Sequence, residues 1–153
     1  MRHGVFEMPV PVPPGLVDEL VALCEREPQN AYHAHSLAVY NPAAALPLLE
    51  ACHEAVQQVA GVELVASHTY FRVYQRGSYL KEHTDREGLD WTVSLMLRCD
   101  APPWPLEVQA EDGTWCPVDG DAVLVHSAKV NHRRSVRYAG DEACVLMLHY
   151  REV

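Results

Sequence analysis

The feature of this 153-residue sequence that most constrains its fold is a change of pattern near Gly61. Before Gly61 lie two stretches with apolar residues at helical spacing. After it come short segments rich in β-branched and aromatic residues, punctuated by Gly, Pro and Asp. These segments have no helical pattern between them, which argues against an open parallel sheet with crossover helices. The order predicts an α+β protein, mainly β, in which a sandwich or jelly roll is buttressed by two N-terminal helices.

The predicted elements divide the chain into a helical front, residues 1–60, and a β barrel, residues 61–153. Apolar residues from Leu16 to Leu23 recur at helical spacing beside acidic residues and predict one amphipathic helix. A second helix is expected from Pro42 to Ala60, ending before Gly61. The stretch from Ala31 to Asn41 is expected to be irregular or extended. The predicted strands cover residues 62–65, 68–74, 91–98, 106–110, 122–125 and 143–150.

Length and composition set the limits of the interpretation. A chain of this length buries one core and not two, so we expect a single domain over residues 1–153. The 48% hydrophobic and 22% charged residues are ordinary for a globular protein. Five cysteines stand singly, without the paired spacing of a zinc site or a disulfide framework. Most of them are expected to be small buried hydrophobic residues in a reducing compartment.

The formal net charge of −9 argues against a nucleic-acid partner, because a phosphate backbone is bound by clustered Lys and Arg. The one basic cluster, Arg133, Arg134 and Arg137, is short and also fits a solvated edge strand. The sequence contains no apolar run of the length of a signal peptide, and none approaches the roughly 20 residues of a membrane span. The predicted location is therefore the cytoplasm, with no membrane partner.

The residues that carry chemistry are His83 and Asp85, in a His-Thr-Asp triplet between two predicted strands, and His132 after a later strand. Two imidazoles and a carboxylate on one face of a small barrel leave coordination positions open, as an Fe(II) oxygenase needs. In a chain with nine histidines a His-x-Asp triplet alone is weak, so its surroundings decide its weight.

The segment from Tyr74 to Asp85, Tyr-Gln-Arg-Gly-Ser-Tyr-Leu-Lys-Glu-His-Thr-Asp, resembles the entry to the metal site of 2-oxoglutarate and Fe(II)-dependent dioxygenases of the prolyl hydroxylase type. The run from Asp119 to Val125 with Asn131-His132-Arg133 is similar to the family's distal-histidine segment. Residues 92–97 match its apolar core strand. The resemblance spans residues 70–150, about half of the chain, and implies a cupin-like double-stranded β-helix.

The resemblance implies that His83, Asp85 and His132 bind Fe(II) and that Tyr74 hydrogen-bonds the cosubstrate 2-oxoglutarate, with O₂ as the oxidant. His126 is an alternative third ligand. His132 is preferred because His126 directly ends its strand, whereas the family places the histidine after a short loop.

The sequence departs from the family at the basic residue that binds the far carboxylate of 2-oxoglutarate. In the family an Arg or Lys stands nine or ten residues beyond the distal histidine, where this chain has Asp141, Glu142 and Ala143. A planar guanidinium suits this task because it binds both carboxylate oxygens. The candidate replacements are Arg98 and Arg137, followed by Arg134 and then Arg72.

The resemblance implies an enzyme that hydroxylates or otherwise oxidises an unactivated C–H bond of a small molecule or an amino-acid side chain. The alternatives are an Fe(II) enzyme that does not use 2-oxoglutarate, a protein-residue hydroxylase of the prolyl type, and an idle metal-binding module. His33 and His35 are expected to line the pocket or lie on the surface, and Asn131 to orient His132. Neither the substrate nor the oligomeric state is predicted.

Overall fold

The structure is a computed structural model that describes residues 4–27 and 36–153. It contains α1 (Leu16–Arg26), the 3₁₀ turn η1 (Ala43–Ala45) and α2 (Leu46–Ala60). The strands are β1 (Val5–Glu7), β2 (Ser36–Tyr40), β3 (Leu64–Tyr74), β4 (Leu80–His83), β5 (Trp91–Cys99), β6 (Leu106–Gln109), β7 (Trp115–Val118), β8 (Ala122–Val125), β9 (His132–Arg134) and β10 (Ala143–Glu152).

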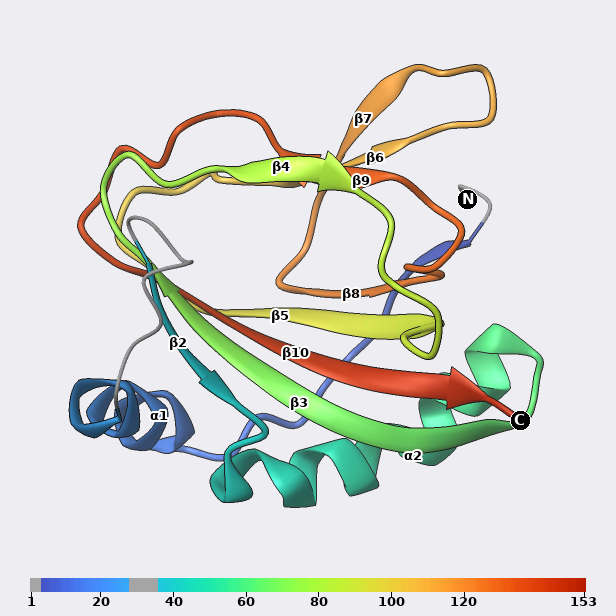
Figure 1. Ribbon diagram of the computed structural model, residues 1–153, viewed down its shortest axis with the longest axis horizontal. Coiled ribbons are helices and arrows are strands. Elements are labelled where there is room, and N and C mark those ends of the chain that lie inside the picture. The colour runs from blue at the N-terminus through green and yellow to red at the C-terminus, as the bar shows by residue number, and fades with distance from the viewer. Residues whose placement is uncertain (1–3, 28–35) are drawn as a thin grey trace.

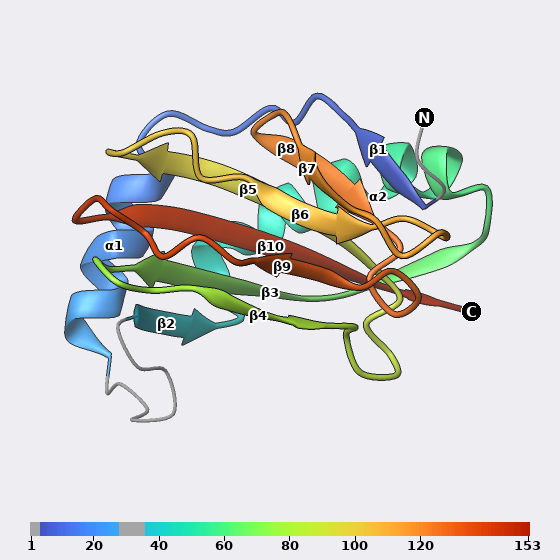
Figure 2. The same ribbon diagram turned by 90° about the horizontal axis from the view of Figure 1, so that it is seen from above.

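The strands form two antiparallel sheets that face each other (Figure 1). The large sheet has the order β1-β8-β5-β10-β3-β2, and the small sheet has the order β4-β9-β6-β7. The helices cover the outer face of the large sheet, and the small sheet covers its inner face, as the view from above also shows (Figure 2). The predicted class, a β jelly roll with two N-terminal helices, is confirmed.

The main core lies between the helices and the large sheet. α1 buries Leu20 and Cys24 on one face, and α2 buries Leu49 and Val56. Both faces contact a continuous cluster on β3, β5 and β10, in which Leu148 is fully buried. Burying such a side chain contributes about 2 kcal/mol, so this layer supplies most of the hydrophobic stabilisation.

Both predicted helices are present, and α2 ends as expected at Gly61, whose φ of 74° is left-handed. The helical front, however, also supplies β1 and β2 to the large sheet. The two strands predicted for residues 62–74 are one strand, β3, because they continue without a turn. β4, β7 and β9 have only three or four residues each. They were not predicted because so short a segment shows no clear alternation of apolar and polar residues.

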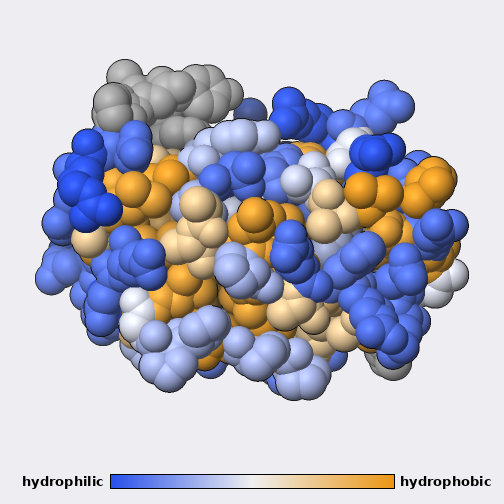
Figure 3. Space-filling model, turned by 90° about the horizontal axis from the view of Figure 1, so that it is seen from below, coloured by the Kyte–Doolittle hydropathy of each residue, from blue (hydrophilic) through white to orange (hydrophobic). Residues whose placement is uncertain are grey.

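The surface seen from the helical side is mixed (Figure 3). Hydrophobic residues emerge there in separate areas between hydrophilic ones, and Leu46, Val59 and Val62 are among the exposed apolar residues of the protein. Isolated exposed apolar residues of this kind are normal for a globular protein. Within the described residues, no helix is long and apolar enough to cross a membrane.

Candidate metal and cosubstrate site

His83, Asp85 and His132 come together at one end of the small sheet. β4 ends at His83 and β9 begins at His132, and the two residues are paired across the strands. Asp85 follows β4 and is fixed by a hydrogen bond from its backbone N–H to the carbonyl of Ser127, at 2.8 Å. One ligand atom from each of the three side chains lies within 4.8 Å of the others.

Both histidines are oriented by backbone carbonyl groups two residues earlier. Nδ1 of His83 lies 2.7 Å from the oxygen of Lys81, and Nδ1 of His132 lies 2.9 Å from the oxygen of Val130. Because a carbonyl oxygen only accepts, each Nδ1 must carry the hydrogen, which leaves Nε2 of a neutral ring with its lone pair. The two Nε2 atoms lie 3.4 Å and 3.6 Å from Oδ1 of Asp85.

The electrostatics of His83, Asp85 and His132 favour a bound cation. Burial alone raises the pKa of Asp85, but hydrogen bonds that its carboxylate accepts whenever Nε2 of His132 or His83 also carries a hydrogen lower it more, so its pKa is well below the usual range. A bound cation would take the place of these Nε2 hydrogens. The hydrogen bond with Asp85 raises the pKa of His83, against the effect of burial. Two imidazole nitrogens and one carboxylate oxygen fit the ligand preferences of a divalent iron ion.

A hydrogen-bond network centred on the hydroxyl of Thr92, on the large sheet, fixes the carboxylate of Asp85. Oγ1 of Thr92 lies 3.3 Å from Oδ2 of Asp85, 2.8 Å from Oγ of Ser127 and 2.8 Å from Nδ1 of His149. A threonine has one hydroxyl hydrogen, so donation to the carboxylate requires Nδ1–H of His149 to donate to Thr92. Burial lowers the pKa of His149 to about 4, which keeps its ring neutral at pH 7.

The three residues open into a pocket of about 310 Å³ between the two sheets. Among the described residues that line it, three are arginines and one, Asp85, is acidic. The lining residues from the described part of the chain are Tyr40, His68, Tyr70, Arg72, Tyr74, Leu80, His83, Asp85, Arg86, Leu89, Thr92, Ser94, Leu106, Val125, Ser127, His132, Arg134, Val145, Met147 and His149.

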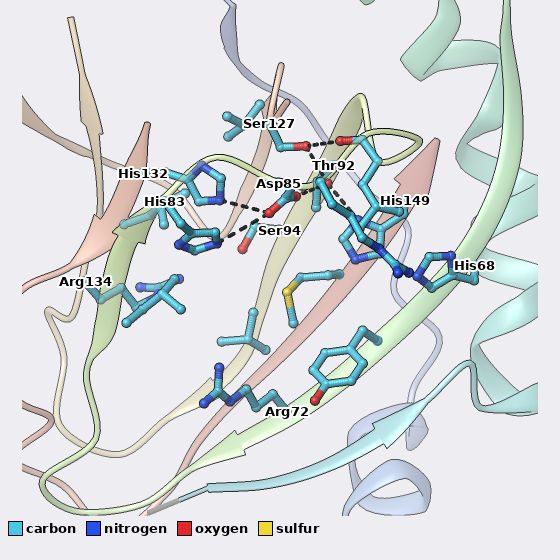
Figure 4. A pocket seen from close by; sticks show the side chains of 18 of the residues that line it. His68, Arg72, His83, Asp85, Thr92, Ser94, Ser127, His132, Arg134 and His149 are labelled. Atoms are coloured by element: carbon cyan, nitrogen blue, oxygen red, sulfur yellow. Dashed lines mark hydrogen bonds and ion pairs between the residues drawn. The ribbon is translucent and has the colours of Figure 1, made fainter. Parts of the chain in front are cut away.

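Two of the arginines define one end of the pocket, which we call the arginine end: Arg72, Tyr74 and Arg134. In Figure 4, Arg72 and Arg134 lie below the His-Asp-His group. Arg134 is 5% exposed, packs over Trp104 with its guanidinium carbon 4.9 Å from the ring centre, and donates to the Trp104 carbonyl. Arg72 lies 4.6 Å over the Tyr74 ring and donates to its hydroxyl at 3.4 Å.

The pocket arginines differ from three arginines elsewhere in how they are neutralised. Arg76, Arg98 and Arg133 each form an ion pair with a carboxylate. Within the described ranges, 4–27 and 36–153, no ion pair is found for Arg72, Arg86 or Arg134. The remaining residues, 1–3 and 28–35, contain no Asp or Glu. A buried cation without a carboxylate is costly, which marks Arg134 as a residue that an anion would stabilise.

The other predicted cosubstrate residues lie elsewhere. Arg98 pairs with Asp18 and Glu142, and Arg137 donates to the carbonyl of Gly77, so neither lines the pocket. Of the four candidates, the structure brings Arg134 and Arg72 to the pocket, the two that ranked lowest from the sequence. Tyr74, the predicted hydrogen-bond donor to the cosubstrate, also lines the pocket. Arg134 is also buried rather than solvated on an edge strand, because its side chain follows that of His132 on the inner face of β9.

Asp141 and Glu142, predicted to occupy the clamp position, are not in the pocket. The last strand begins only at Ala143, and its pocket-lining residues are Val145, Met147 and His149. The connection from β9 to β10 is thus longer than the spacing argument assumed. These acids are therefore not placed to repel an anion in the pocket, although the last strand itself supplies no basic side chain to it.

The structure also shows where His126, the alternative third ligand, and Asn131, the predicted partner of His132, lie. His126 stacks on Trp91, with ring centres 4.2 Å apart, and pairs with Glu152, away from the other potential ligands. Asn131 donates to Gln109 and not to His132, which uses a backbone carbonyl instead. His33 and His35 lie outside the described residues.

The opposite end of the pocket, which we call the histidine end, consists of Tyr40, His68, Arg86 and His149. The sequence suggested only that His149 could face the barrel, and the other three residues were not predicted. Rings of Tyr40 and His68, and of His68 and His149, lie 4.9 Å apart in each pair. In Figure 4, His149 and His68 lie to the right of the metal-binding candidates, away from the arginine end. The signal in the sequence was present, since His149 on β10 and His68 on β3 are cross-strand partners, but the register was unknown.

Comparison with known proteins identifies the fold. No protein-family model matches the sequence, and no curated protein matches it. Solved structures do match. A prolyl-4-hydroxylase of Pseudomonas putida superposes with a TM-score of 0.70 at 23% identity, over 99% of this chain and 94% of that one. The fold is that of the 2-oxoglutarate and Fe(II)-dependent oxygenases.

Other structures with this oxygenase fold are similar to the chain over nearly its whole length. The α-ketoglutarate-dependent epimerase SnoN of nogalamycin biosynthesis matches with a TM-score of 0.77 at 14% identity, over 99% of this chain and 78% of that one. HygX of Streptomyces hygroscopicus, solved with nickel, 2-oxoglutarate and hygromycin B, matches with a TM-score of 0.73 at 12% identity, over 98% and 83%. At these identities the likeness establishes the fold, and function has to be argued from the site.

Proposed function

We propose that the protein is an Fe(II)- and 2-oxoglutarate-dependent oxygenase that oxidises an unactivated C–H bond of a small molecule or amino-acid side chain. The observation that carries this proposal is the combination, in one pocket, of His83, Asp85 and His132 with the unpaired guanidinium of Arg134. Iron(II) at that site would supply the oxidation, in which 2-oxoglutarate, O₂ and R–H become succinate, CO₂ and R–OH.

The chain's own residues would bind and orient the reactants. Arg134 and Arg72 would receive the far carboxylate of 2-oxoglutarate from the two sheets, with Tyr74 between them. Trp104 supports this arrangement, because it contacts Arg134 and packs edge-on against Tyr74 with ring centres 4.9 Å apart. Apolar Val145 and Met147 line the same cavity and exclude water from the bound cosubstrate.

The test is an anaerobic titration of the Fe(II) protein with 2-oxoglutarate, followed by the weak visible charge-transfer band. Arg134→Gln and Arg72→Gln should each weaken 2-oxoglutarate binding by about tenfold or more, because each removes a charge-assisted hydrogen bond. Arg98→Gln and Arg137→Gln should bind it as the wild type does. The 2-oxoglutarate affinity of Arg134→Lys should lie between those of the wild type and Arg134→Gln, because the lysine ammonium keeps the charge but loses the bidentate contact.

Two other results would contradict the proposal. A wild-type protein that binds Fe(II) but gives no band and releases no succinate is an iron enzyme that does not use 2-oxoglutarate. A band that is lost in Arg98→Gln and retained in Arg134→Gln would overturn the assignment of the arginine end.

A further inference from the structure

The charges of the pocket remain unbalanced after the proposed occupants are placed in it. Iron(II) with Asp85 carries one net positive charge, 2-oxoglutarate carries two negative charges, and Arg72 with Arg134 carries two positive ones. The sum is positive by one before Arg86 is counted and by two afterwards. In the part of the chain that the structure describes, no second acidic side chain lines the pocket to reduce this excess.

Arg86 is the cation of the histidine end. It directly follows the metal-ligand candidate Asp85 and lines the pocket, and its charge helps to lower the pKa of both His68 and His149. Burial is the larger cause of each shift, and because both pKa values lie below the ordinary imidazole value of 6.5, both rings are mostly neutral at pH 7. Neither ring therefore contributes a charge, and among the described residues Arg86 is the one ionised group of the histidine end.

The neutral ring of His149 adds a directional contact. Its Nδ1–H is used by Thr92, so Nε2 is an acceptor, and the structure gives it no partner within the described residues. His149 lies beside the group that holds Asp85, so a molecule bound to Nε2 is placed next to the candidate metal site. Such a molecule needs an N–H or O–H to donate.

From this arrangement we infer that the substrate is a small acid, with a carboxylate or phosphate group bound by Arg86 and an N–H or O–H group bound by His149. This inference rests on the proposed function. The cavity of about 310 Å³, at the small end of ligand pockets and shared with 2-oxoglutarate, fits a compact molecule. The rings of Tyr40 and His68 form the wall along which it lies.

The test measures binding rather than turnover. Anaerobic Fe(II) protein saturated with 2-oxoglutarate is titrated by calorimetry with N-acetylglycine and with its neutral counterpart, N-acetylglycinamide. A second pair, glycerol 3-phosphate and glycerol, distinguishes a phosphate from a carboxylate. The wild type should bind one of the acids about tenfold more tightly than its neutral counterpart, as a charge-assisted contact requires.

Variants assign the contact to the histidine end. Arg86→Gln should abolish the preference for the acid and leave the 2-oxoglutarate band intact. Arg76→Gln is the matched control, because it removes one exposed arginine outside the pocket, and the preference should persist. N-acetylsarcosine, which lacks the N–H, should bind more weakly than N-acetylglycine. Fe(II) should broaden the acetyl methyl resonance of bound N-acetylglycine more than Zn(II) does, because the molecule lies beside the metal.

The outcomes separate the proposed function from the substrate class. No charge-transfer band in the wild type, read before any probe is added, overturns the proposed function. A normal band with acids that bind no better than their neutral counterparts, or do not bind at all, overturns the substrate class alone. A preference for the acid that persists in Arg86→Gln overturns the substrate class in the same way.

Discussion

The two sheets of this protein differ in length and in what they carry. In the large sheet β3, β5 and β10 have 9 to 11 residues, and their outer face packs on the helices. In the small sheet the strands have 3 or 4 residues, and they position His83, His132 and Arg134. The sheet with the least hydrophobic support holds most of the candidate catalytic groups.

The difference teaches how a short-stranded sheet can position ligands. His83 and His132 are cross-strand partners with imidazoles fixed by backbone carbonyls, and Asp85 is tied to the large sheet by Thr92. Orientation therefore comes from hydrogen bonds, whereas stability comes from the apolar layer on the far side of the large sheet. Mutations in the two regions should have separable effects.

The largest effect is expected for His132→Ala. Loss of one of three ligands should abolish detectable Fe(II) binding and the 2-oxoglutarate band, because even outer partners of metal ligands contribute about 10- to 100-fold in affinity. The fold should persist, since the substitution leaves the helix-backed core intact. Metal binding is measured by calorimetry and folding by circular dichroism. His126→Ala is the control. Loss of Fe(II) binding in that variant, with binding retained in His132→Ala, would show that His126 is the third ligand instead.

The next largest effect is expected for Leu148→Ala, in the large sheet. Leu148 is fully buried under the helices, so the variant should lose about 3 kcal/mol of unfolding free energy through lost burial and a cavity. Fe(II) affinity of the folded fraction should stay close to that of the wild type. Val65→Ala, at an exposed position of the same sheet, should lose far less. Equal losses, measured by chemical denaturation, would contradict the division of roles.

The smallest effect is the pH dependence that His149 gives to the metal-free protein. Its pKa is about 4 in the folded state and near 6.5 when unfolded, so the unfolded state binds the extra proton between these values. Stability should be complete above pH 6.5 and fall by about 2 kcal/mol by about pH 5. Denaturation of wild type and His149→Gln should show a steeper loss in the wild type. Parallel curves would mean that His149 is not a buried neutral ring.

The sequence predicted the residues of the candidate metal site better than the arginines of the pocket, and the reason is physical. The His-x-Asp triplet is local, and His132 follows a recognisable strand, so the order of segments along the chain indicated which groups meet. Which arginine reaches the pocket is decided by strand register and by which face of the strand turns inward. Spacing pointed to Arg98 and Arg137, whereas the fold turns Arg134 and Arg72 inward.

The sequence by itself determined the helical and strand-rich regions, the jelly-roll class and the three candidate metal ligands, because hydrophobic period and motif order are properties of the chain. Only the tertiary structure decided that the front supplies two strands, that Asp141 and Glu142 stay outside the pocket, and that Arg86 and His149 line the same pocket. These facts depend on loop length and strand register. A shift of one residue turns a side chain to the opposite face, and composition and period do not encode that choice.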